Sequence, residues 1–319
     1  MNPSLPLLQS RRSRQSSSSA SSSSKRLATE NPTELAYSLQ KRHIFTESEW
    51  RLRDPEQFAR HGIGPQGKMI LLEARKTYCN FSLYQTLINN APSPCPTETS
   101  SRMLASFAER EGFNLFTLTY MLGRWLSDYT ISRLHDTINT LYVVGDSATC
   151  ADTFTNSILR MFHCVLTSHI NDFDFERFVP VREVTKLLYF PPLHHDFPFK
   201  NPLVNEMLRG RSFNVPYQGE LVEIEEIKCV VRLNKLPRPD QLPTNPKFHL
   251  IIQFDSPNDD GASFLASELV HYLRQLREHE GDRDFDCKND FGVLCSTAWI
   301  DPPCSTCRQH FDHILSLPD

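Results

Sequence analysis

The chain has 319 residues, of which 39% are hydrophobic and 10% aromatic, enough for a substantial core in one large domain or two modest ones. Its net charge of −4 argues against a protein coated with basic residues for nucleic-acid binding, although a local basic patch is compatible with it. No apolar stretch approaches the roughly 20 residues that span a membrane, and no apolar core follows the first positive charges, so we expect neither a membrane span nor a secretory signal. We therefore expect the nine cysteines to be reduced thiols in the cytosol or nucleus.

Residues 1–33 form a low-complexity tail. The stretch RRSRQSSSSASSSSKR combines a serine tract with basic residues and has almost no apolar surface to bury, so disorder is the expected state. Two interpretations stay open. The tail is either a solubilising segment or a split basic nuclear-import signal that is regulated by phosphorylation of its serines.

Residues 34–138 are predicted to form a helical N-terminal subdomain. Folded sequence is expected to begin near Thr46, which has capping-box spacing to Glu49. Apolar residues at three- and four-residue intervals, interrupted by a proline-rich segment, predict the helices that follow. We expect one helix over 68–90 and two helices within 102–129, separated at Gly112.

Residues 139–280 alternate between strand and helix patterns, which predicts an α/β domain with a mainly parallel, covered sheet. The expected strands are 141–144, 186–190, 212–215, a run within 225–234, and 248–254. The expected helices are 152–166, 202–209 and 263–279.

The segment LYVVGDSATCADTF (141–154) has the strand–loop–helix frame of a P-loop, whose working form is G-x-x-x-x-G-K-[ST]. Gly145 holds the first position. Cys150, Ala151 and Asp152 stand where glycine, lysine and serine or threonine belong. The chain is therefore an NTPase, a former NTPase, or a chance likeness to one.

Several segments in order resemble the superfamily 3 helicase domain of parvovirus Rep and non-structural proteins, and more closely the Rep-like proteins of avian adenoviruses. They are LASFAEREGFN with MLGRWLSD, LYVVGDSATCADTFTNSILRMF, VTKLLYFPPL, NEMLRGRSFNVPYQGELVEIEEIKCVVRLN, and KFHLIIQFD with DDGASFLASELVHYLRQLREH. The resemblance covers about residues 45–280. It implies a P-loop NTPase-like core of the AAA+/superfamily 3 type, with a polar sensor at Asn234. It also marks a vestigial nucleotide-binding loop: Gly145, Asp146, Ser147, Ala148, Thr149, Cys150, Ala151, Asp152 and Thr153.

The chemistry that this family needs is largely missing. Phosphoryl transfer depends on positioning and on neutralising charge, yet Ala151 supplies no positive charge. The Asp152 carboxylate would repel phosphate by about 4 kcal/mol for charges about 4 Å apart at an effective dielectric constant near 20. Where the family has metal-binding carboxylates, this chain has Pro191 and Pro192, and Lys247 is a poor replacement for the family's arginine finger. We therefore expect no catalytic residue and no bound ATP or Mg²⁺.

Residues 281–319 form a Cys/His-rich tail. Cys304-x2-Cys307 followed by His310 has the spacing of a structural zinc site, and Cys287 and Cys295 form a looser pair before it. Three interpretations stay open: a zinc site, a redox C-x-x-C motif, and unrelated free thiols.

Three functions compete. The favoured one is a non-structural viral protein whose silent helicase-like domain serves as a binding or regulatory module in viral replication or host interaction, expected in the host nucleus and otherwise in the cytoplasm. Its partners would be unidentified viral or host proteins, with DNA contact weakly supported and oligomerisation implied by the family's rings. The second is a residual ATP-dependent DNA helicase or NTPase. The third is a zinc-stabilised adaptor on an inert scaffold.

Overall fold

A five-stranded parallel sheet lies at the centre of the described structure. The computed structural model describes residues 31–90, 103–127, 138–192, 201–238, 242, 248–257, 263–279 and 293–294. Within them the strand order is β2-β3-β6-β1-β7, and all neighbouring strands are parallel. The strands are β1 (Thr140–Val144), β2 (Val165–Thr167), β3 (Leu187–Phe190), β6 (Cys229–Leu233) and β7 (His249–Gln253). This arrangement confirms the predicted α/β class with a mostly parallel sheet.

The central strands are apolar along their length because both faces of the sheet are covered. All residues of β1 and of β6 are buried. Successive side chains of a strand point to opposite faces. Leu141 and Val143 of β1 join one hydrophobic cluster, whereas Tyr142 and Val144 join another. One sheet therefore separates two cores.

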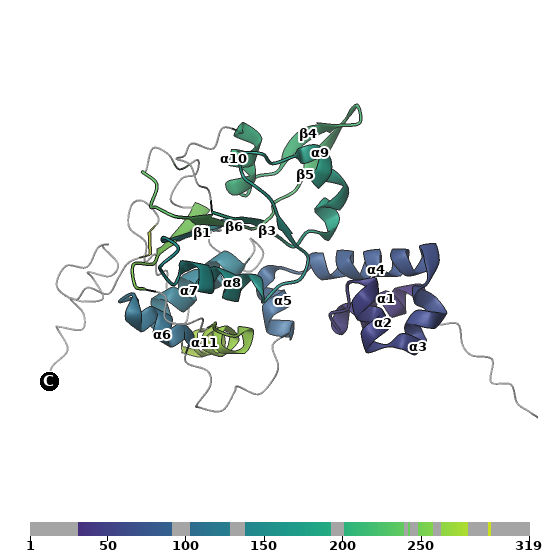
Figure 1. Cartoon of the computed structure of the whole chain (residues 1–319), viewed down its shortest axis with the longest axis horizontal. Coiled ribbons are helices and arrows are strands. Elements are labelled where there is room, and N and C mark those ends of the chain that lie inside the picture. The colour runs from purple at the N-terminus through teal and green to yellow at the C-terminus, as the bar shows by residue number, and fades with distance from the viewer. Residues whose placement is uncertain are drawn as a thin grey trace, which may run out of the picture.

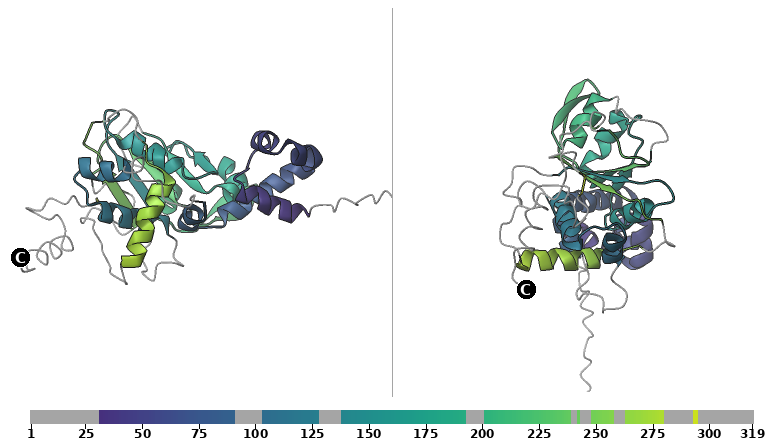
Figure 2. Two further views of the ribbon diagram at one scale, coloured as in Figure 1. Left: turned by 90° about the horizontal axis from the view of Figure 1, so that it is seen from below. Right: turned by 90° about the vertical axis from the view of Figure 1, so that its left-hand side faces the viewer.

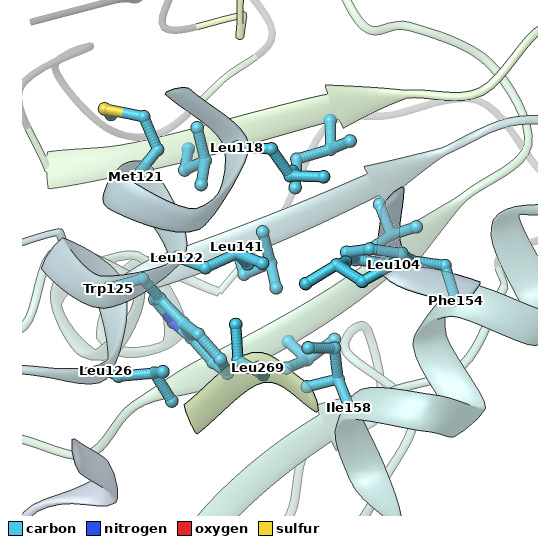
Figure 3. Close-up of a cluster of buried hydrophobic side chains, with 14 of the residues drawn as sticks. Leu104, Leu118, Met121, Leu122, Trp125, Leu126, Leu141, Phe154, Ile158 and Leu269 are labelled. Carbon is cyan, nitrogen blue, oxygen red and sulfur yellow. The ribbon is translucent and has the colours of Figure 1, made fainter. Parts of the chain in front are cut away.

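Helices α5–α8 and α11 cover the face of the sheet that carries Leu141 (Figure 1). Figure 3 shows Leu104, Trp125, Ile158 and Leu269, one from each of four of these helices, gathered around Leu141. Burying a side chain of this size stabilises the fold by roughly 1.5–3 kcal/mol. The helices are α5 (Leu83–Asn90), α6 (Met103–Arg110), α7 (Leu115–Leu126), α8 (Ala151–Leu159) and α11 (Ala266–His279).

The opposite face is covered by two short α-helices, a 3₁₀ helix and a β-hairpin (Figure 1). The hairpin turns at Gln218 and Gly219, whose φ angles are 51° and 87°. Two consecutive positive φ angles are typical of the tight turns whose twist matches paired strands. These elements are α9 (Phe175–Phe178), η2 (Val179–Val184), α10 (Pro202–Leu208), β4 (Phe213–Tyr217) and β5 (Glu220–Ile224).

The first helices form a separate cluster beside the sheet (Figure 2). They are α1 (Pro32–Lys41), α2 (Glu47–Arg53), α3 (Pro55–Gln57), the π-helical turn η1 (Phe58–Gly62) and α4 (Gly64–Cys79). They surround a hydrophobic core of their own, which includes the fully buried Trp50. The predicted capping box is confirmed: the Glu49 amide donates to Thr46 Oγ1 (3.2 Å), and the Thr46 amide donates to Glu49 Oε2 (3.1 Å). The predicted boundary at residue 138 stays a prediction, although side chains of α5–α7 belong to the core on one face of the sheet, whereas α1, α2 and most of α4 have a core of their own.

Two predictions about the N-terminal helices are wrong. Helical structure begins at Pro32 rather than near Thr46, because Asn31 accepts from the Thr33 amide and caps α1. The helix predicted over 68–90 is two helices. Ser82 and Gln85 exchange hydrogen bonds between side chain and backbone at 3.0 Å, so they cap the start of α5.

The helix predicted over 152–166 is also wrong at its end. Helix α8 ends at Leu159, and strand β2 begins at Val165. Between them Cys164 has a φ of 58°, which is incompatible with a continuing helix. Val165 then pairs with Leu187 of β3, so tertiary pairing overrides the helical spacing of the apolar residues.

In the described ranges, every helix is too short or too polar to cross a membrane.

Candidate functional site

The predicted loop and the predicted sensor lie at the same edge of the sheet. Gly145 directly follows β1, and Asn234 directly follows β6, its neighbour. The register pairs Val144 with Leu233, so the two residues leave adjacent strands at the same level. From β1 the chain runs to β2 at the far edge, whereas β7 lies on the other side of β1. Open α/β sheets bind ligands at the carboxyl ends of strands, where such connections diverge.

The backbone amides of the loop are largely used within the protein. Phosphate binding by such a loop requires amides that point at the ligand. Five of them instead donate to protein oxygens: Gly145 to the Leu233 carbonyl (3.0 Å), Ala148 to Asp146 Oδ1 (2.8 Å), Thr149 to the Asp146 carbonyl (3.2 Å), Cys150 to the Ser256 carbonyl (3.3 Å) and Ala151 to Thr149 Oγ1 (3.4 Å). A phosphate could recruit these amides only after the loop opened.

Arg232 of β6 donates hydrogen bonds to backbone carbonyls of the loop. Its side chain is fully buried. Nη1 donates to the Gly145 carbonyl at 2.7 Å and also to the Leu233 carbonyl, while Nη2 donates to the Asp146 carbonyl at 3.3 Å. The loop therefore turns carbonyl oxygens toward a cation that belongs to the chain itself. A phosphate-binding loop does the opposite, because it turns backbone N–H groups toward an anion.

Asp152 is the counter-ion of this buried guanidinium. Arg232 Nε donates to Asp152 Oδ1 at 2.8 Å. Asp152 lies in the first turn of α8, where the helix dipole favours a negative charge. The carboxylate that is unfavourable for phosphate binding thus neutralises a charge whose burial without a partner would cost several kcal/mol.

Gly145 is required by close packing of the loop. A Cβ at this position would lie 2.3 Å from Thr149 Oγ1 and 2.9 Å from the Phe254 carbonyl oxygen. Thr149 Oγ1 donates to the Asp146 carbonyl at 2.9 Å, and Thr149 forms an antiparallel bridge with Pro257. The first glycine of the P-loop frame therefore permits a closed loop here.

Strand β3, which pairs with β6, carries the Tyr189 hydroxyl and is not followed by metal-binding carboxylates. It ends at Phe190, and Pro191 and Pro192 follow. Burial raises the pKa of the Tyr189 hydroxyl, the Asp152 charge raises it further, and the Arg232 charge lowers it. The basic residue expected before the last strand, Lys247, lies outside the described residues.

The predicted zinc ligands are also outside the described residues: Cys287, Cys295, Cys304, Cys307 and His310. Across the residues that are described, no group of three or more His, Cys, Asp or Glu side chains could hold a metal ion. The zinc site stays a prediction.

Sequence reasoning missed Arg232, although the sequence contains a signal for it. CVVRL places one charge inside an apolar central strand, and a buried charge requires a partner. Asp152, which has no function in a P-loop, was the unmatched carboxylate. Pairing the two would have predicted the closed loop.

No family model matches the chain. The chain is 43% identical over 210 residues to a protein of Fowl adenovirus A serotype 1 (strain CELO / Phelps) described as "Uncharacterized protein ORF12". The match covers 64% of this chain and 99% of the fowl adenovirus protein. The chain therefore belongs to the family of the fowl adenovirus ORF12 protein and is an avian adenovirus protein.

Proposed function

We propose that the protein is a non-catalytic module on a P-loop NTPase-like fold, in which Arg232 holds the former nucleotide-binding loop closed. The observation that carries this proposal is the set of hydrogen bonds from the buried guanidinium to the loop carbonyls and to Asp152. The helicase-like origin is supported by the position of the loop after β1 and of Asn234 after the neighbouring β6. The module acts in adenovirus replication or host interaction, in the host nucleus, through a viral or host protein partner.

The physical argument against nucleotide binding has three parts. The loop amides would have to leave their protein acceptors, and each intramolecular hydrogen bond is worth about 1 kcal/mol net. No lysine attracts the phosphates, since Ala151 holds that position. Asp152 repels them unless Arg232 remains bound to it, and a bound Arg232 keeps the loop closed. Nucleotide binding and the closed loop are therefore mutually exclusive.

Calorimetry on the full chain with Mg²⁺ and a non-hydrolysable ATP analogue tests the proposal. We expect no detectable heat of binding at millimolar nucleotide. Binding in the micromolar range would contradict the proposal, because the loop would then cradle phosphate without its lysine.

A restored loop tests the P-loop-like frame separately. The variant combines Cys150→Gly, Ala151→Lys and Asp152→Thr with Arg232→Met, so that no buried charge is left unpaired. We expect it to bind the analogue, whereas the matched control without Ala151→Lys does not. If a folded restored variant also fails to bind, the frame is not that of an NTPase.

A further inference from the structure

Two cysteines that are distant in sequence meet where the N-terminal helices join the sheet. Cys79 is the last residue of α4, and Cys164 directly precedes β2. Their side chains are hydrogen-bonded to each other, both are partly exposed, and both are free thiols. By contrast, Cys150 and Cys229 are buried.

The backbone around the pair is held in place by its neighbours. Cys164 has a φ of 58°, which is uncommon for a residue with a side chain. Its carbonyl accepts from the Lys186 amide at 2.8 Å, and the preceding His163 amide donates to the Tyr78 hydroxyl at 2.9 Å. These bonds connect the segment before β2 to the last turn of α4, so the two thiols are fixed opposite each other.

Two cations, Lys186 and Arg75, stand near the pair and favour a thiolate on either cysteine. Lys186 Nζ donates to the Tyr78 carbonyl at 3.4 Å and to the Cys79 carbonyl at 3.2 Å. The hydrogen bond from Cys79 lowers the pKa of the Cys164 thiol, burial opposes this effect, and the charges of Arg75 and Lys186 support it. Donating that bond, together with burial, raises the pKa of Cys79. The pair therefore shares one thiolate, and the hydrogen bond from Cys79 assigns it to Cys164.

Small molecules reach Cys79 through a cleft. This cleft has a volume of about 740 Å³ and lies between the end of α4, the start of α5, η2 and the segment that joins β5 to β6. Cys79 lines it together with Asn80, Ser82, Lys186 and Lys228. Its lining is polar and of mixed charge, with five glutamates and four cations, and Cys164 does not line it but is itself partly exposed.

We propose that Cys79 and Cys164 are a redox-modification site that forms an intramolecular disulfide, with a small disulfide such as glutathione disulfide as the oxidant. This inference goes beyond the proposed function and does not depend on it. The disulfide covalently joins α4 of the N-terminal helices to the segment that leads into edge strand β2.

The reaction has two exchange steps. The Cys164 thiolate attacks glutathione disulfide, which forms a mixed disulfide and releases one glutathione thiolate. Cys79, no longer bound to a thiolate and still near Lys186 and Arg75, loses its proton to that leaving group. The Cys79 thiolate then attacks Cys164 Sγ and releases the second glutathione. In sum, two protein thiols are oxidised and one glutathione disulfide becomes two glutathione molecules.

The test is peptide mapping of the full chain after reduction, incubation with glutathione disulfide, alkylation of the remaining thiols and non-reducing digestion. We expect a linked peptide that contains Cys79 and Cys164, with a mass about 2 Da below the sum of the two free peptides. In Cys79→Ser we expect glutathione to remain on Cys164. In Cys164→Ser we expect Cys79 to be alkylated. The control Cys150→Ser keeps the linked peptide.

Wild-type protein alone suffices to overturn the proposal, whatever the variants do. Full alkylation of both cysteines under these conditions, glutathione that persists on wild-type Cys164, or linkage of either residue to a different cysteine would each exclude the site.

Discussion

The two ends of the parallel sheet both bury positive charge, and they do so in different ways. At the carboxyl end, the Arg232 side chain is enclosed by a loop and paired with Asp152. At the amino end, Lys186 and Lys228 precede β3 and β6. Lys186 donates to carbonyls of the last turn of α4, where a helix leaves its carbonyls unpaired. Lys228 donates to the Ile138 carbonyl at 2.8 Å.

The two ends also differ in what supplies the acceptors of the buried cations. Around Arg232 the loop itself supplies the acceptors, at the edge of the sheet where α/β folds usually bind a ligand. At the amino end the acceptors belong to elements that are already in place, and a cleft of about 740 Å³ remains beside the lysines.

Removal of the enclosed cation should have the largest effect. Arg232→Ala replaces a large, fully buried side chain by a cavity and leaves two loop carbonyls and the half-exposed Asp152 without their donor, so we expect unfolding to become easier by about 3–5 kcal/mol. Denaturant titration measures this change. The control Arg177→Ala removes a surface arginine whose side chain is 90% exposed and ion-paired with Asp174; we expect less than about 0.5 kcal/mol. Equal effects would mean that Arg232 does not hold the loop.

The buried carboxyl group of Glu268, on helix α11, tests how the protein stabilises a buried negative charge. Burial raises the pKa of Glu268 to about 7, although its carboxylate accepts the Leu104 amide at the start of α6. The folded state therefore holds the proton more tightly than the unfolded state. The contribution of Glu268 to stability is fully present below its ordinary pKa near 4.5 and falls by about 3 kcal/mol as the pH rises through 7. Glu268→Gln should remove this part of the pH dependence in denaturant titrations between pH 4.5 and 8.

Gly145→Ala tests whether the carboxyl end is closed as tightly as the contacts indicate. The added methyl group would press on Thr149 Oγ1 and the Phe254 carbonyl, and we expect a loss of about 2 kcal/mol. Gly112→Ala is the comparison, because φ there is 68° but nothing lies within 4 Å of a Cβ. We expect about 1 kcal/mol for that variant. If thermal and denaturant unfolding rank the two in reverse, the loop is more open than described.

Lys228→Met should have the smallest effect among the four. It leaves the Ile138 carbonyl without one donor and Glu226 without its ion-pair partner at 3.8 Å, next to an open cleft that water can enter, so we expect about 1 kcal/mol. Lys76→Met, which removes a surface ion pair with Glu183, serves as its control. A loss as large as that of Arg232→Ala would remove the distinction between the two ends.

The sequence predicts the strands well where apolar runs are continuous, as in β1 and β6. It predicts too long a helix after Asp152, because Phe154, Ile158 and Val165 continue a helical spacing across the left-handed residue Cys164. The loop is named from its local strand–loop–helix frame and Asn234 from the family resemblance, and the roles of both stay predictions. Partners that only topology brings together, such as Cys79 with Cys164, leave no local pattern.

The strand order has a consequence for how the chain folds during synthesis. Strand β1 is made first, but both of its neighbours, β6 and β7, are made much later. Helices α1–α4 have their own core and can fold as soon as they leave the ribosome. Strand β1 cannot pair along both of its edges until β7 has been synthesised, and such non-local pairing is slow. Chains that stop before His249 would present an unpaired apolar strand, so incomplete products should aggregate or require a chaperone.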